Sequence, residues 1–133
     1  MLEALSCIAI AILFEAGGEP SDGQIAVAQV IRNRMADPRY PSDACQVVKQ
    51  GYYWQGFPIR DRCQFSFYCD GKSDNPKDTQ QYYNSLYIAW LSSIREDVTG
   101  GATHYHAAGS FPRWADTRYL TKKINNHIFY LIP

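Results

Sequence analysis

A single glutamate, placed where an apolar segment stops, is the strongest chemical signal in this sequence. Glu15 ends the apolar run 4–14, and Gly17-Gly18 follow directly behind it. If the upstream residues form a buried helix, the carboxyl lies at the boundary between core and solvent, where desolvation raises its pKa. A general acid requires that neutral form. We therefore predict that Glu15 is catalytic; the alternative is a helix-end glutamate that bonds backbone N–H groups or an arginine.

Histidines on a predicted strand form a second group with chemical potential. His104 and His106 alternate with Thr103 and Tyr105, so both imidazoles are expected on one face of the strand. Together with His127 or a glutamate they would provide the ligands of a zinc site. A polar strand beside a cleft is the more common meaning of such a pair, and we expect no metal and no cofactor.

Helices are predicted to position Glu15. The pattern favours a largely buried helix over 2–15 and a second helix over 21–35, which a capping box at 21–24 would start. Asp43 or Ser42 would cap a short helix containing Val47 and Val48. A third long helix is expected after Thr79, ending at Gly100-Gly101. Its aromatic stripe, which includes Tyr83, Tyr87 and Trp90, is interpreted as core packing.

The remaining segments indicate short strands and loops. Residues 51–62 fit neither helical nor strand periodicity and are predicted to be a loop, with Tyr52, Tyr53 and Trp54 at an exposed cleft edge. Strands are expected at 63–68, 103–107, 119–123 and 128–131. The first of these would place Gln64 and Ser66 on a polar face.

Composition limits the partners. The chain has 133 residues, with 13 basic and 13 acidic side chains, which excludes charge-driven binding to nucleic acid. The apolar run is too short to span a membrane and follows Glu3 rather than basic residues, so we interpret it as a core helix and not a cleavable signal peptide. We expect residues 1–133 to form a single domain, monomeric and without stable membrane insertion.

The four cysteines permit three pairings, and their even number favours disulfides over reduced thiols. If residues 64–68 are extended, Cys63 and Cys69 lie too far apart to bond each other. Each is then expected to pair with Cys7 or Cys45.

Together these motifs resemble the SleB/CwlJ family of cell-wall hydrolases. The resemblance covers nearly the whole chain and rests on these stretches: Phe14-Glu15-Ala16, Gly18-Glu19-Pro20, Gly23 to Val30, Asn33-Arg34, Tyr40-Pro41, Cys63 to Phe67, Cys69-Asp70-Gly71, Thr99 to His106, Trp114, His127 and Phe129-Tyr130.

The resemblance implies an α+β fold: a mostly helical, lysozyme-like or lytic-transglycosylase-like catalytic domain with a small antiparallel sheet beside the cleft. It implies that Glu15 is the acid that cleaves the glycan bond between N-acetylmuramic acid and N-acetylglucosamine. Such an enzyme acts on peptidoglycan at the bacterial cell wall or in the periplasm. A compact lysis enzyme, such as a phage endolysin released at lysis, would fit this sequence.

The reaction type depends on the number of carboxylates. A water-using muramidase usually needs a second one, and Glu19, Asp22 and Asp70 are the candidates. A lytic transglycosylase needs only one glutamate, which protonates the leaving group and then accepts a proton from the muramic C6 hydroxyl. We favour the transglycosylase, with Glu19 as a structural carboxylate. The muramidase is one alternative, and a metal-dependent amidase or peptidase using His104 and His106 is another.

Sugar-binding residues are predicted around this acid. Their side chains offer hydrogen bonds to hydroxyl and acetamido groups, or an aromatic platform under a sugar ring. The predicted set is Gln64, Ser66, Thr103, Tyr105, His106 and Trp114.

Overall fold

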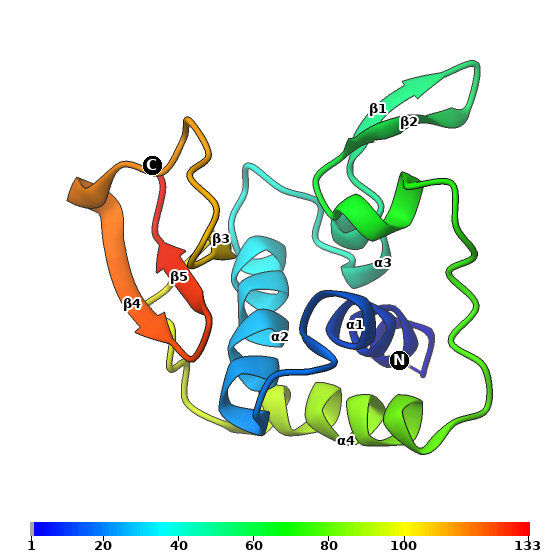
Figure 1. Ribbon diagram of the computed structural model, residues 1–133, viewed down its shortest axis with the longest axis horizontal. Helices are drawn as coiled ribbons and strands as arrows, with labels where there is room; N and C mark the ends of the chain where they lie inside the picture. Colours follow the sequence, from blue (N-terminus) through cyan, green and yellow to red (C-terminus); the bar gives the residue numbers. More distant parts are fainter. Residues whose placement is uncertain (1) are drawn as a thin grey trace.

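The computed structural model describes residues 2–133, without the side chains of Leu2 and Trp54, so the prediction for the Trp54 side chain lies outside the described part. Three long helices, α1 (Leu2–Ala16), α2 (Ser21–Ala36) and α4 (Gln80–Ile94), form the body, with the short helix α3 (Ala44–Val48) beside them. Figure 1 shows α2 between α1 and a small sheet. The predicted α+β class, mostly helical with a small antiparallel sheet, is confirmed.

The sheet has the order β3-β5-β4, and all of its pairs are antiparallel. Its strands are β3 (His104–Ala107), β4 (Leu120–Ile124) and β5 (His127–Tyr130). They confirm the strands predicted at 103–107, 119–123 and 128–131. The short 3-10 helix η2 (Thr117–Tyr119) precedes β4.

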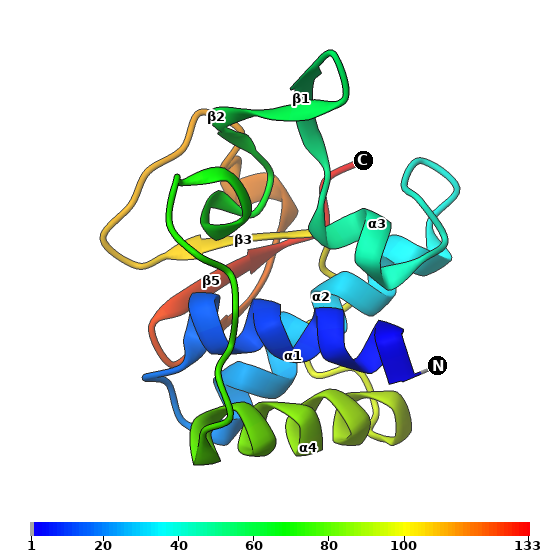
Figure 2. The ribbon, with the colours of Figure 1, turned by 90° about the vertical axis from the view of Figure 1, so that its right-hand side faces the viewer.

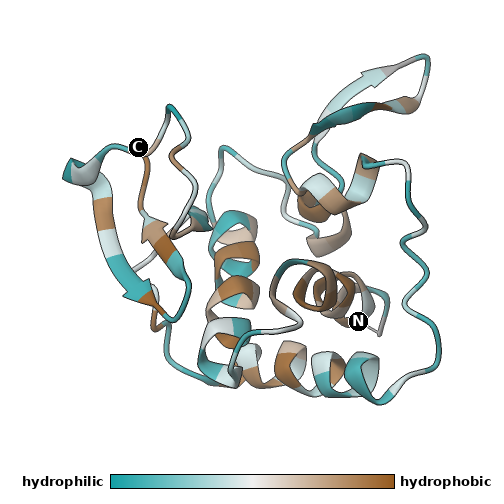
Figure 3. Ribbon diagram, in the orientation of Figure 1, coloured by the Kyte–Doolittle hydropathy of each residue, from teal (hydrophilic) through white to brown (hydrophobic). Residues whose placement is uncertain are grey.

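Helix α2 is apolar on most of its surface because it packs on both sides. Ile25 and Ile31 face the helical core, which includes Ile8 and Ile12 of α1, whereas Val30 packs against Phe129 of the sheet. In Figure 3, α1 is coloured hydrophobic along most of its length. The central position of α2 therefore joins the helical layer to the sheet and fixes their relative placement.

The predicted N-terminal caps are correct for two helices and wrong for a third. Asp43 caps α3 by accepting from the backbone N–H of Gln46, and Thr79 caps α4 by accepting from that of Tyr82. The predicted capping box of α2 is wrong. Pro20 occupies the N-cap position without a side-chain hydrogen bond, because Ser21 already belongs to the first turn.

The loop predicted for 51–62 is wrong, since this segment is a hairpin of β1 (Gly51–Trp54) and β2 (Phe57–Cys63). Gln55 and Gly56 both have positive φ, as a tight two-residue hairpin turn requires. The predicted strand 63–68 is also wrong, because the chain bends and forms the 3-10 helix η1 (Ser66–Cys69). In Figure 2 the hairpin stands above the helical body.

The bend at η1 also corrects the disulfide prediction. Cys63 bonds Cys69 and Cys7 bonds Cys45, so the presence of disulfides is confirmed but the predicted pairing is wrong. The physical reason is that residues 64–68 are not extended. The turn of η1 brings the Cα atoms of Cys63 and Cys69 to 6.1 Å, within reach of a disulfide.

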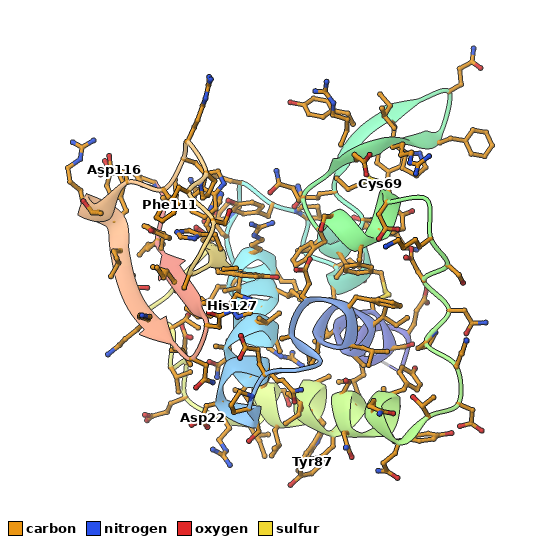
Figure 4. The ribbon with its side chains drawn as sticks, viewed as in Figure 1. Asp22, Cys69, Tyr87, Phe111, Asp116 and His127 are labelled. Carbon is orange, nitrogen blue, oxygen red and sulfur yellow. A yellow bond between two sulfur atoms is a disulfide. The ribbon has the colours of Figure 1, made fainter. Side chains whose placement is uncertain are left out.

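The aromatic stripe of α4 is not core, contrary to the prediction. Tyr83, Tyr87 and Trp90 are 52%, 60% and 47% exposed, whereas Ile88 and Ala89 on the other face are buried. In Figure 4 the side chain of Tyr87 points away from the helical body. Helix α4 covers α1 and α2 from one side only, and it ends at Ile94, well before the two glycines.

Candidate active site

A cleft of about 390 Å³ opens at the end of α1, and Glu15 lies in its wall. Helix α1 ends at Ala16, one residue after Glu15, and the chain then turns through Gly17-Gly18. Phe14 stacks on Phe67 of η1, with 5.3 Å between ring centroids, which holds the end of α1 against η1. Glu15 also lines a second, more open depression formed by residues 13–19, Gln81 and Asn126. The carboxyl therefore stands between two hollows of the surface.

Burial controls the protonation of Glu15. It raises the pKa of this carboxyl above its usual value of 4.5, and the Tyr105 hydroxyl, which donates to the carboxylate, lowers it in part. The pKa of Tyr105 is itself raised well above 10.0, first by burial and then by the charge of Glu15. Tyr105 therefore stays a protonated donor that orients the carboxyl, and the cleft favours a neutral acid.

Strand β3 supplies one wall of the cleft through His104, Tyr105 and His106. The His106 Nδ1–H donates to the Ala107 carbonyl at 2.7 Å, and Nε2 accepts from the Tyr130 hydroxyl at 2.9 Å. Both nitrogens of His106 are thus occupied, which holds the ring in one orientation. The ring centroid of His106 lies 5.7 Å from that of Trp114, and the ring centroids of Trp114 and His104 are 4.9 Å apart.

Gln64 and Ser66 line the opposite wall, together with Phe65. Gln64 is exposed on the bend before η1 and Ser66 is exposed at the first position of η1, so neither lies on the predicted polar strand face. The disulfide between Cys63 and Cys69 encloses this bend, and Phe65 is buried beneath it. The structure thus brings Glu15 together with five of the six predicted sugar-binding residues: Gln64, Ser66, Tyr105, His106 and Trp114.

Thr103 and Asp70 are not part of this cleft. The Thr103 side chain is 2% exposed, and its hydroxyl is bonded to His104 Nδ1 at 2.9 Å and accepts from the Ile132 N–H. Asp70 accepts from the backbone N–H of Lys72 and starts the loop that follows η1. Thr103 precedes β3, so the strand alternation that would place it beside Tyr105 does not apply, and its hydroxyl is bonded inside the fold.

Glu19, another candidate carboxylate, lies beside a buried histidine. Its Oε1 lies 3.5 Å from Nδ1 of His127, a residue at the start of β5 that also lines the cleft. Burial lowers the pKa of His127, Glu19 raises it in part, and His106 lowers it again. Asp22, the third candidate, is exposed and lines a separate hollow near Ile25 and Lys122.

Arg34 is a charged cleft residue to which the sequence argument assigned no role. It lies in the last turn of α2, lines the cleft and is 5% exposed. A signal was available in the spacing, because Arg34 follows Val27 and Val30 on a face of α2 that otherwise holds buried apolar side chains. An arginine at such a position is either paired or functional.

Among residues 2–133, no three His, Cys, Asp or Glu side chains lie close enough together to hold a metal ion. His104 Nδ1 is engaged by Thr103, and burial together with Arg34 and Arg39 lowers the pKa of His104 to about 4. The described helices include none with the length and apolar character needed to cross a bilayer.

Comparison with known proteins identifies the family. A family model described as cell wall hydrolase matches residues 18–130 of this chain. The chain belongs to this cell wall hydrolase family. The match begins three residues after Glu15, so the case for Glu15 rests on the geometry of the cleft.

Curated relatives of this cell wall hydrolase include spore cortex-lytic enzymes. The one from Halalkalibacterium halodurans is 31% identical over 94% of this chain and 34% of its own length. The one from Bacillus cereus is 32% identical over 94% of this chain and 43% of its own length. The chain thus spans less than half the length of these relatives.

Two solved structures are similar to the cell wall hydrolase over nearly its whole length. The catalytic domain of the germination-specific lytic transglycosylase SleB from Bacillus anthracis has a TM-score of 0.72 and 26% identity, covering 96% of this chain and 93% of that one. The catalytic domain of the Bacillus cereus SleB protein has a TM-score of 0.74 and 26% identity, and the match covers 98% of this chain and 91% of that one. The resemblance inferred from sequence motifs is therefore confirmed.

Proposed function

We propose that residues 1–133 act as a single catalytic domain that cleaves the glycan strand of peptidoglycan at the bacterial cell wall, as a lytic transglycosylase with Glu15 as its acid and base. One observation carries this proposal: Glu15 is the single carboxyl among the described residues that line the cleft. Similarity to a lytic transglycosylase catalytic domain supports it.

The first step needs a protonated carboxyl. Glu15, whose pKa is raised by burial, donates its proton to the glycosidic oxygen while positive charge develops at the muramic C1 carbon. The position of Glu15 between two hollows leaves room for sugar on both sides of the scissile bond. Gln64 and Ser66 on one wall and Trp114 on the other hold the sugar rings.

The second step uses the same residue as a base. The ionised Glu15 accepts the proton of the muramic C6 hydroxyl, whose oxygen then bonds C1 and closes a 1,6-anhydro ring. Glu15 is neutral again at the end of the cycle, and no water molecule is consumed. Tyr105 supports this step, because its hydroxyl donates to the carboxylate form.

A water-using muramidase is less well supported, because the candidate second carboxylate Glu19 lies beside His127 and lines the neighbouring depression instead of the cleft. A metal-dependent amidase is disfavoured by the imidazole of His106, whose two nitrogens already have protein partners. The monomeric state and the phage origin stay predictions from sequence.

Product analysis separates these reactions. Purified vegetative sacculi are digested in water enriched in heavy oxygen, and the soluble fragments are analysed by mass spectrometry. We expect anhydromuramyl ends without the label. Labelled reducing ends would establish a muramidase, and cleaved peptide or amide bonds would establish an amidase or peptidase.

A further inference from the structure

Arg34 is held rigidly in the wall of the cleft. Its Nε–H donates to the Thr103 carbonyl at 2.7 Å. Its Cζ atom lies 5.1 Å from the ring centroid of Tyr40 and 5.6 Å from that of Phe65, so the guanidinium packs over two aromatic rings. Such a side chain is already ordered before any ligand arrives.

The charge of Arg34 has no counter-ion in the protein. Its Nη1 atom is buried without a hydrogen-bond partner, and the ion pairs formed within residues 2–133 do not include Arg34. Burial lowers its pKa, but a guanidinium remains protonated at neutral pH. An uncompensated charge in a side chain that is 5% exposed is costly unless something else pairs with it.

Neighbouring side chains of the cleft do not provide that partner. Glu15 lines the same cleft but is not among the ion pairs formed within residues 2–133, so it does not pair with Arg34. His104 is uncharged at neutral pH, since its pKa is lowered to about 4. Arg34 is therefore the fixed positive charge of this cleft, and it lies in the same lining as Glu15 and Gln64.

We propose that Arg34 forms an anion subsite that binds a carboxylate on the branch that muramic acid carries at O3. This rests on the proposed function, in which a glycan strand occupies the cleft. The sugar hydroxyl and acetamido groups of that strand are neutral, so its carboxylates belong to the O3 branch, either as the free lactyl group or within a stem peptide. A guanidinium N–H that donates to a carboxylate forms a charge-assisted hydrogen bond, which also fixes the orientation of the sugar.

The test modifies the substrate and leaves the wild-type chain intact. Cleavage is measured on glycan strands stripped of stem peptides, which carry free lactyl carboxylates, and on the same strands after conversion of these groups to methylamides. A second pair of substrates keeps the stem peptides, with their carboxylates either native or amidated. We expect neutralisation to raise KM and lower kcat/KM by about tenfold or more in at least one pair, with kcat little changed.

A matched pair of variants assigns the effect to Arg34. In Arg34→Met, the preference for the carboxylate-bearing substrate should disappear. In Arg39→Met it should persist, because Arg39 is an exposed cation paired with Asp37 at 2.8 Å. If Arg34→Met fails to fold, the comparison of substrates with the wild-type chain still decides the question.

Each outcome has one meaning. A loss confined to the stripped strands identifies the lactyl carboxylate as the ligand, and a loss confined to the peptide-bearing strands identifies a stem-peptide carboxylate. Equal kcat/KM within both pairs would overturn the anion subsite while leaving the glycosidase function intact. Absence of cleavage on all four substrates would instead overturn the proposed function and the subsite with it.

Discussion

Glu15 and Glu19 are close in sequence but lie in different environments. Glu15 belongs to the last turn of a core helix, where burial raises its pKa and a tyrosine hydroxyl is its partner. Glu19 lies in the turn before α2, with its carboxylate 3.5 Å from His127. Similar carboxyl groups thus become a proton donor in one place and the neighbour of a buried histidine in the other, and the surrounding elements make the difference.

Replacing Glu15 by Gln should give the largest effect on activity. Loss of the general acid should lower the lysis rate of purified sacculi by ~10³-fold or more. The amide removes the cost of a buried charge, so the variant should be at least as stable as the wild type at neutral pH. Lysis and thermal unfolding measure the two effects. Undiminished lysis would contradict the assignment of Glu15 as the general acid.

The stability part of this comparison depends on pH in a defined direction. Burial raises the pKa of Glu15 in the folded state above 4.5, so the folded chain binds more protons than the unfolded chain in this range. Wild-type stability should therefore fall as pH rises from 4.5 to the folded-state pKa, relative to Glu15→Gln. A constant difference in Tm between the two proteins across this range would contradict the assignment.

Shortening the acid by one methylene tests geometry apart from chemistry. Glu15→Asp retains a carboxyl group, but its oxygen atoms move back from the cleft by about one bond length. Misplacement of this size should lower kcat by ~10²-fold, less than removal of the acid. Single-turnover kinetics on glycan strands measure it. A rate equal to that of the wild type would indicate a cleft that tolerates more movement than the packing of Phe14 on Phe67 suggests.

Tyr105→Phe tests the partner of Glu15. Without the hydroxyl, the pKa of Glu15 should rise further, because the bond from Tyr105 favours the ionised form. The limb of the pH–rate profile on which activity falls with rising pH should move to higher pH, and kcat should fall by about tenfold, equivalent to ~1.4 kcal/mol. A limb that moves to lower pH, or stays in place, would exclude this contact.

Glu19→Gln is expected to have the smallest effect on activity. It keeps the size of the side chain and removes a carboxylate that lies 3.5 Å from Nδ1 of His127, an imidazole whose pKa is lowered by burial, so the free energy of unfolding should change by less than about 1 kcal/mol. The lysis rate should fall by less than about tenfold, because Glu19 makes no contact with the reacting atoms in the proposed mechanism. Denaturant titration and lysis assays measure both. A loss of activity as large as that of Glu15→Gln would make Glu19 a second catalytic carboxylate.

The helical framework was predictable from sequence because the apolar spacing and the cap residues act locally. Thr79 and Asp43 could be recognised as caps, and the glycines after Ala16 fixed the end of α1. The exposure of Tyr83, Tyr87 and Trp90 could not be predicted from sequence, because helical spacing alone does not say which face of α4 is buried. Which face is buried depends on tertiary packing against α1 and α2.

The β1–β2 hairpin and the bend at η1 were missed for a different reason. The aromatic residues Tyr52, Tyr53 and Phe57 are exposed on a projecting two-stranded sheet, which has no buried face to impose a period of two. A single change of backbone direction at η1 then reversed the conclusion about Cys63 and Cys69. Chemistry was more predictable than conformation here, because Gln64 and Ser66 reached the cleft without the predicted strand.

Arg34 shows the limit of single-residue arguments. Its position on an apolar face was visible in the sequence, but the absence of a counter-ion depends on every element packed around it. The same applies to Thr103, which strand periodicity placed beside Tyr105 and whose hydroxyl bonds His104 inside the fold.

A carbon-detected NMR titration of the Glu15 carboxyl tests the central claim most directly. The resonance is assigned by its absence in Glu15→Gln, and the folded protein is titrated with pH. The buried environment predicts a titration midpoint above the ordinary value of 4.5, with a further rise in Tyr105→Phe. A midpoint at or below 4.5 in the wild-type chain would show that Glu15 is an ordinary ionised carboxylate at neutral pH, and would contradict its role as the acid.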